Sequence, residues 1–273
     1  MIESGNRIPG IRRKKTYVSV WNIPQMNQRN PYVIALWSAI FPGMGHIMLS
    51  KYIMGFILFI WAVFVNYESH LNQAILYTLL GRFQQAKEAV DIRWLLLYCP
   101  TYLFTIWDSY RACVNINNLY ILADRENAPV ECFSISALGV SFLRKNSPWT
   151  AVCWSILSPG AGQFVIRHTI VSIFLIVWWI VIVYFSQVLP AVHMTLLGRL
   201  EEARTVLDAQ WLLNIPSVYF FSIYDSYISV VGNNDAFEWE LANFLRSRYQ
   251  GEGFPMPFKT KGGDEMYVVY HLD

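Results

Sequence analysis

Charged residues are scarce in this sequence. They make up 15% of the 273 residues, whereas 55% are hydrophobic, and a soluble domain usually carries about 25% charged residues. Three long stretches contain no Asp, Glu, Lys or Arg: Asn30–Ser50, Thr169–Gly198 and Trp211–Tyr224. Apolar runs of roughly 20 residues are what a ~30 Å hydrocarbon layer requires of a spanning helix. The shortage of charge therefore argues against a soluble protein and predicts a helical integral membrane protein.

Cysteine is also rare, and catalytic motifs are missing. The chain has four cysteines, Cys99, Cys113, Cys132 and Cys153. They have neither the spacing of metal ligands nor that of a paired disulfide framework. The sequence lacks a G-x-S-x-G elbow, a glycine loop for phosphate and an H-E-x-x-H motif. We therefore expect no catalytic residues, no metal and no cofactor, and interpret the chain as a non-enzyme.

Basic residues are concentrated before the first apolar stretch. This N-terminal arm contains Arg7, Arg12, Arg13, Lys14, Lys15 and Arg29. It has no apolar core of the kind that a cleaved signal peptide carries, so we expect no removed leader. The net charge of +2 is too small to indicate nucleic acid as a partner. We interpret the arm as a cytoplasmic patch that sets topology, with binding of anionic lipid as the alternative.

The chain contains an internal repeat. A shift of 117 residues aligns Pro31–Asn117 with Pro148–Asn234 without a gap, and 30 of the 87 aligned pairs are identical. Such a repeat sets the domain boundaries directly. We divide the chain into a basic arm (1–30), unit one (31–117), a linker (118–147), unit two (148–234), and a polar C-terminal helix with a loose tail (235–273).

Each unit has four predicted parts. A short apolar stretch is broken by Pro and Gly, which stop or kink a helix; the break residues are Pro42, Gly43 and Gly45 in unit one and Pro159, Gly160 and Gly162 in unit two. A long span follows, over about Tyr52–Tyr67 in unit one. Leu71–Asp91 has the spacing of an amphipathic helix interrupted at Gly81, typical of an interfacial hairpin. The last part, Trp94–Val114, is a second long span. The predicted fold class is all-α, a polytopic helical membrane protein.

The broken stretch either crosses the bilayer or dips in and returns. Crossing gives three spans per unit and two inverted units, as in many transporters. Dipping gives two spans per unit and parallel units. With dipping segments, all but five of the 21 Lys and Arg residues lie inside; with crossing segments, seven lie outside. We favour the parallel, re-entrant arrangement, because a Pro-Gly break inside lipid leaves backbone groups that need protein partners.

Asp108 and Asp225 are the most informative polar residues, because a carboxylate in a spanning helix costs roughly 2.5–3.5 kcal/mol on insertion scales. Arg111 follows Asp108 at i+3 and can pair with it, whereas Ile228 occupies that place in unit two. We expect each carboxylate to bind backbone N–H groups in the broken loop of its own unit. The alternatives are an ion or proton site and a placement without a role.

His46 follows Gly45 in the first break, and its counterpart in unit two is Gln163. Glutamine forms hydrogen bonds but is a poor metal ligand. We therefore interpret this pair as polar groups that fill the two loops, without a catalytic role.

These motifs resemble the small two-transmembrane-helix domain family. In that family a helix is followed by Gly-x-x-Gly-x-His, a glycine begins the next helix, and Trp-Asp lies near the end of the last. The matching residues here are Gly43, Gly45, His46, Gly55, Trp107 and Asp108 in unit one, and Gly160, Gly162 and Asp225 in unit two. The chain is also similar to duplicated multi-pass proteins of Bacillus-like bacteria that share Pro-Gly-x-Gly-His/Gln and Trp-Asp-Ser/Ala-Tyr. The resemblance implies a bacterial plasma membrane protein and no substrate. The distribution of Lys and Arg predicts that both termini are cytoplasmic.

Two functions follow as hypotheses. The first is a non-catalytic scaffold in the lipid bilayer that binds a protein partner or a second copy of the chain. The second is a small-solute or ion transporter or channel that uses the broken helices and the Asp108/Asp225 pair. A water-lined cavity that joins the two carboxylates favours transport. Carboxylates bound to their own loops favour the scaffold.

Overall fold

The computed structural model describes residues 15–16, 27–126, 128, 130, 132–136, 139–250, 258–261 and 265–268. Most of the N-terminal arm, including Arg7, Arg12, Arg13 and Lys14, lies outside the described residues, as does much of the tail after Gln250. The described chain is helical, with two short antiparallel hairpins.

Unit one forms six helices. They are α1 (Pro31–Ile40), α2 (Met44–Met48), α3 (Tyr52–Ser69), α4 (Leu71–Leu79), α5 (Phe83–Ala89) and α6 (Ile92–Arg125). Unit two forms α7 (Pro148–Leu157), α8 (Ala161–Val165), α9 (Thr169–Phe185), α10 (Val188–Leu196), α11 (Leu200–Val206), α12 (Ala209–Leu212) and α13 (Ile215–Tyr249). The first helix of each unit begins with proline at a position whose N–H needs no helical acceptor.

The 117-residue offset of the sequence is also an offset of the structure. Helices α1, α2, α4 and α5 have the same bounds, shifted by 117, as α7, α8, α10 and α11. Positive φ angles recur at the same spacing, at Gly43 and Gly160 after each break and at Gly81 and Gly198 between the paired short helices. The same local residue pattern therefore produces the same local backbone twice.

The broken segment is a helical hairpin. Helix α1 has ten residues and is about 15 Å long. The chain turns at Gly43, whose φ of 94° favours glycine, and α2 then packs back against both α1 and α3. A side chain at position 45 would collide with Ser38 and with the backbone of Ile34, so glycine permits this close approach.

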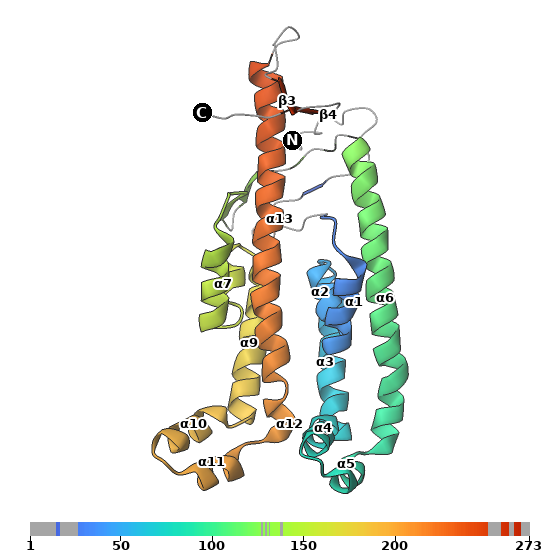
Figure 1. Ribbon diagram of the computed structural model, residues 1–273, viewed down its shortest axis with the longest axis vertical. Coiled ribbons are helices and arrows are strands. Elements are labelled where there is room, and N and C mark those ends of the chain that lie inside the picture. The colour runs from blue at the N-terminus through green and yellow to red at the C-terminus, as the bar shows by residue number, and fades with distance from the viewer. Residues whose placement is uncertain are drawn as a thin grey trace.

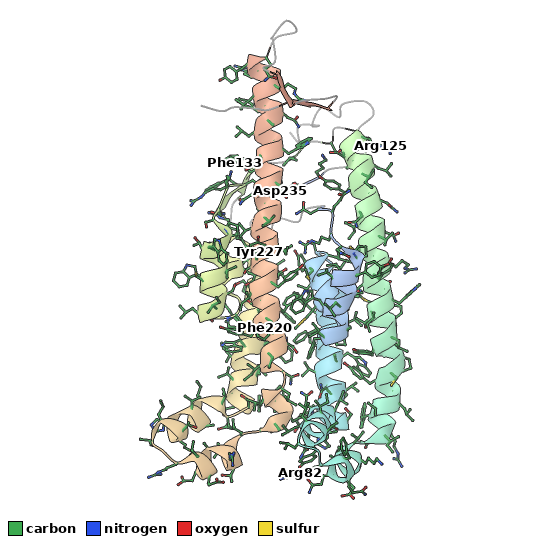
Figure 2. The ribbon with its side chains drawn as sticks, in the orientation of Figure 1. Arg82, Arg125, Phe133, Phe220, Tyr227 and Asp235 are labelled. Carbon is green, nitrogen blue, oxygen red and sulfur yellow. The ribbon has the colours of Figure 1, made fainter. Side chains whose placement is uncertain are left out.

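Both units point in the same direction along the long axis of the molecule. The α4–α5 and α10–α11 pairs lie together at one end, and the C-terminal ends of α6 and α13 lie at the other (Figure 1). Arg82 marks the first end, and Arg125 and Asp235 lie toward the second (Figure 2). The predicted hairpin in 71–91 is present as α4 and α5, with the turn at Gly81.

The structure differs from the sequence prediction in both long helices, in the linker and in the tail. Helix α6 continues to Arg125, past the predicted end at Val114, because Leu119–Ala123 still favours a helix and no proline or glycine stops it. Helix α13 runs unbroken from unit two to Tyr249. The linker contains a hairpin of β1 (Phe133–Ser136) and β2 (Gly139–Phe142), and the tail, predicted to be loose, contains β3 (Phe258–Lys261) and β4 (Glu265–Val268).

Among the described residues, α3 alone is long and apolar enough to cross a membrane. Helices α9 and α10 pass the same test together, although a bend of 56° separates them. Helices α6 and α13 mix their apolar residues with Trp, Tyr, Asn and Asp, which lowers their mean hydropathy. The polytopic arrangement therefore stays a prediction.

Candidate functional site

The candidate site occurs twice, where each long helix contacts the hairpin of its own unit. Its outermost contact joins an asparagine of the long helix to the backbone just before the hairpin. The N–H of Arg29 donates to Oδ1 of Asn117 over 3.0 Å, and Nδ2 of Asn117 donates back to the Arg29 carbonyl over 2.8 Å. Asn234 makes the same two bonds with Asn146, at 2.9 and 2.8 Å. We call these paired bonds the amide tethers.

A tyrosine forms the second contact in each unit. The hydroxyl of Tyr102 donates to the carbonyl of Ala39 over 2.6 Å, and the hydroxyl of Tyr219 donates to that of Ile156 over 2.6 Å. These carbonyls lie in the last turns of α1 and α7, where helical donors run out. The tyrosines therefore satisfy acceptors that the breaks leave without a partner.

The predicted carboxylates make the third contact. Nε2 of His46 lies 3.1 Å from Oδ2 of Asp108, and Nε2 of Gln163 lies 3.3 Å from Oδ2 of Asp225. His46 and Gln163 are fully buried. The structure thus brings together the residues that the sequence singled out, one pair in each unit, and gives histidine and glutamine equivalent positions.

The two carboxylates differ in their cationic partner. Asp108 accepts from Arg111 over 2.9 Å, and the Arg111 guanidinium also lies 4.3 Å from the centre of the Trp107 ring. Asp225 is 3% exposed, and a cation from the basic arm acts on it: Arg29, just before unit one, acts electrostatically on Asp225 and lines the same small cavity. Ile228 carries no charge, so Arg29, the residue bonded in the first amide tether, supplies the positive charge beside Asp225.

The loop partner differs from the predicted one. In unit two, the N–H of Gly160 donates to Oγ of Ser222 over 2.9 Å, so a hydroxyl of α13 receives it. Ser222 also accepts from Gln163 through its carbonyl over 2.9 Å and donates to Oε1 of Gln163 over 3.2 Å. The Ser222 hydroxyl, one turn before Asp225, therefore accepts from the Gly160 N–H in place of the carboxylate. The Asp225 carboxylate instead accepts from the side chain of Gln163 in α8, the helix that follows the break.

The cavity beside Asp225 is small, and Asp108 is not among the residues that line it. The cavity beside Asp225 has a volume of about 10 Å³, which is space for about one water molecule. A larger cavity of about 450 Å³ lies between the units and has no charged side chain in its lining. Within the described residues, no three His, Cys, Asp or Glu side chains are grouped as metal ligands would be.

Comparison with known protein families, curated proteins and solved structures finds no match. The geometry of the two sites is therefore the basis for any assignment. In both sites, the polar groups that the sequence singled out bind groups of their own unit.

A polar cluster between the units was not predicted. Nε2 of Gln210 donates to the carbonyl of Asn66 over 2.6 Å and to its Oδ1 over 2.8 Å. Asn72 donates to the Gln210 carbonyl over 2.8 Å, and Asn214 donates to the same carbonyl over 3.1 Å. We call Asn66, Asn72, Gln210 and Asn214 the inter-unit amide cluster.

The two copies of the repeat contain a signal for this cluster. At the equivalent positions the other copy has Val183, Leu189, Arg93 and Leu97. At each of these four positions, the amide side chain is therefore present in the unit whose residue joins the cluster and absent from the equivalent position of the other unit. Residues common to both copies, such as Asn117/Asn234 and Tyr102/Tyr219, mark contacts inside each unit instead.

Proposed function

We propose that this chain is a polytopic protein of the bacterial plasma membrane that organises or binds partner proteins and catalyses no reaction. One observation carries the proposal: each intramembrane carboxylate is bonded to the hairpin of its own unit. The sequence resemblance to small two-transmembrane-helix domains supports the same location. A transporter needs polar groups that a solute can reach along a path, and these groups are committed to helix packing.

Exposed apolar stripes support the membrane assignment. Along α3, Ile53, Ile57, Ile60 and Phe64 are exposed at helical spacing, and along α9 the same holds for Ile173, Val177, Ile180 and Tyr184. Soluble monomers rarely expose contiguous apolar patches of such extent. Hydrocarbon is the environment in which these surfaces are stable.

The proposed topology has four spans, α3, α6, α9 and α13, with α1–α2 and α7–α8 as re-entrant hairpins. Helix α1 is about 15 Å long, about half of a ~30 Å hydrocarbon layer. Among the described residues, the Lys and Arg residues of the end that carries the short paired helices are Arg82, Lys87, Arg93, Arg199 and Arg204. The other end, with the arm, linker and tail, is then cytoplasmic by the positive-inside rule.

Cysteine labelling in intact cells tests this topology. In a variant without the native cysteines, Gln85→Cys and Glu201→Cys place exposed thiols at the tips of unit one and unit two, and Lys145→Cys places one at the opposite end. We expect a membrane-impermeant maleimide to label positions 85 and 201 from outside and position 145 only after the membrane is opened. Labelling of 85 and 201 from opposite sides would instead establish inverted units.

The turns between α4 and α5 and between α10 and α11 are the proposed partner-binding surface outside the membrane. Leu79, Leu80 and Phe83 are exposed in unit one, and Leu196, Leu197 and Leu200 are exposed at the matching places in unit two. A photoreactive amino acid at Gln85 or Glu201 should cross-link to a defined protein partner, whereas the same residue at lipid-facing Ile57 should not. Equal cross-linking at all three positions would count against a specific partner surface.

Flux measurements separate the scaffold from the transporter. Purified protein in vesicles that contain a pH-sensitive dye should give no proton or ion flux above that of empty vesicles. Flux that is abolished by Asp225→Asn would overturn the proposal and assign the carboxylate a transport role.

A further inference from the structure

Lys15 of the basic arm is buried inside the protein. It is 5% exposed, and its ammonium group lies 2.5 Å from Oδ1 of Asp124. The same Nζ atom lies 4.0 Å from the ring centre of Trp239 and 5.4 Å from that of Tyr120. A carboxylate and two aromatic faces therefore surround one ammonium group.

Both units contribute to this cage. Tyr120 and Asp124 lie in the last turns of α6, and Trp239 lies in the second half of α13. Arg125, at the end of α6, and Asp235, within α13, both lie toward the same end of the molecule (Figure 2). Asp235 also lines the cavity of about 350 Å³ that Lys15, Tyr120 and Trp239 border. Lys15 thus contacts both long helices at once.

The chemistry of the cage matches an alkylammonium group. A cation within about 6 Å of an aromatic face is attracted by the ring quadrupole, and the attraction grows when water is excluded. A carboxylate adds a charge-assisted hydrogen bond. The next residue, Thr16, forms a parallel bridge with Val130, so the arm is also joined to the linker.

We propose that the ends of α6 and α13 form a binding site for a primary alkylammonium group, which Lys15 fills from within the chain. In filling it, the arm clamps the two units together at the end proposed to be cytoplasmic. This role is separate from any contact of the arm with anionic lipid. It holds whether or not the chain is a scaffold, because it depends only on Asp124, Trp239 and Tyr120.

Amine acetylation tests whether the cage holds Lys15. The protein is reconstituted in neutral phosphatidylcholine vesicles and, separately, in vesicles with anionic phosphatidylglycerol. The acetylation of Lys15 is measured by mass spectrometry against exposed Lys145 on the same end. We expect Lys15 to react about tenfold more slowly than Lys145 in both vesicles, and Trp239→Leu with Asp124→Asn to remove the difference. Protection that needs anionic lipid, or that survives the double substitution, would overturn the proposal.

Chemical rescue tests the ligand class and the clamp together. Spin labels at Arg125→Cys and Ala242→Cys report the separation of the ends of α6 and α13, in protein whose exposed Cys99 and Cys153 are replaced. In Lys15→Gly the distance distribution should broaden, n-butylammonium should narrow it again, and n-butanol should have no effect. Lys145→Gly, which removes an exposed ion pair with Glu238, is the matched control and should leave the distribution narrow. An unchanged distribution in Lys15→Gly, or equal rescue by n-butanol, would refute the clamp.

Discussion

Gln210 of unit two donates from one side-chain nitrogen to both the carbonyl and the side-chain oxygen of Asn66 in unit one. Valine and arginine stand at the corresponding positions of the other copy. Helices in lipid gain nothing from burying apolar surface against each other, so interhelical hydrogen bonds and close packing select the partner. These two residues therefore help to determine how one unit lies against the other.

A double-mutant cycle at Asn66 and Gln210 should detect this coupling. Asn66→Val copies the residue of unit two, and Gln210→Leu removes the donor without opening a large cavity. Interhelical hydrogen bonds in membranes average about 0.6 kcal/mol, so the two bonds should give a coupling energy of about 1 kcal/mol. Thermal unfolding in detergent measures it, with Gln85→Leu on an exposed face as the control. Fully additive effects would show that the pair contributes no specific interaction.

Replacing His46 of α2 by glutamine, the residue of unit two, should leave the stability of the protein nearly unchanged. Gln163 contacts Asp225 in the way that His46 contacts Asp108, so His46→Gln should change the free energy of unfolding by less than about 1 kcal/mol. His46→Leu leaves the Asp108 carboxylate without its buried donor and should cost about 1–3 kcal/mol. Unfolding curves of the two variants, compared at equal detergent concentration, decide the matter. Equal losses in both would show that the imidazole has a role that an amide cannot fill.

The fold was predictable where residue type dictates backbone shape. Pro42 and Gly43 indicate the first break, and Gly81 indicates the turn between α4 and α5. The pattern was less informative where tertiary contacts decide: the chain after Val114 carries three asparagines that favour a helix end, yet Asn117 is satisfied by Arg29 and the helix continues. Asn117 therefore lies inside the helix and bonds to a residue 88 positions away in the sequence.

The candidate site was predictable in its members and only in part in its bonds. The i+3 spacing places Arg111 on Asp108, as the structure shows. Sequence spacing within one helix gave no reason to place Arg29 near Asp225, because that approach depends on how the units pack. The identical pairs Asn117/Asn234 and Tyr102/Tyr219 make contacts inside each unit, whereas the inter-unit amide cluster lies at positions that differ between the copies.

Loss of an amide tether should destabilise the unit that contains it. Asn117→Leu removes two hydrogen bonds to the backbone of Arg29; the Arg29 N–H loses its acceptor, and the Arg29 carbonyl keeps only the weak donor Sγ of Cys113 at 3.4 Å. The expected loss is about 1–3 kcal/mol, and Asn234→Leu should give a similar loss because its bonds match. The neighbouring exposed Asn118→Leu is the control and should change the free energy of unfolding by less than about 0.5 kcal/mol. If Asn117→Leu behaves like Asn118→Leu, the tether is not a determinant of stability.

Cys132 in the linker should be a slow thiol at neutral pH. Burial, the negative charge of Glu240 and a hydrogen bond to Glu240 together raise the pKa of Cys132 to about 12, and burial contributes most. Because the thiolate is the reactive form, the rate of maleimide labelling should rise about tenfold per pH unit from pH 7 to 9, without a plateau. Glutathione, with an ordinary thiol, should approach a plateau in that range.

Glu240→Gln tests the cause of this slow reaction. It removes the charge beside Cys132 while it keeps the shape of the side chain, so the pKa of Cys132 should fall and labelling at pH 8 should become faster. The matched change Glu238→Gln, two residues earlier on α13 and paired with Lys145, should leave the rate unchanged. If both variants label at the rate of the parent protein, burial alone controls the thiol. If Cys132 of the parent reacts as fast as glutathione at pH 7, the linker does not pack against α13 as the structure shows.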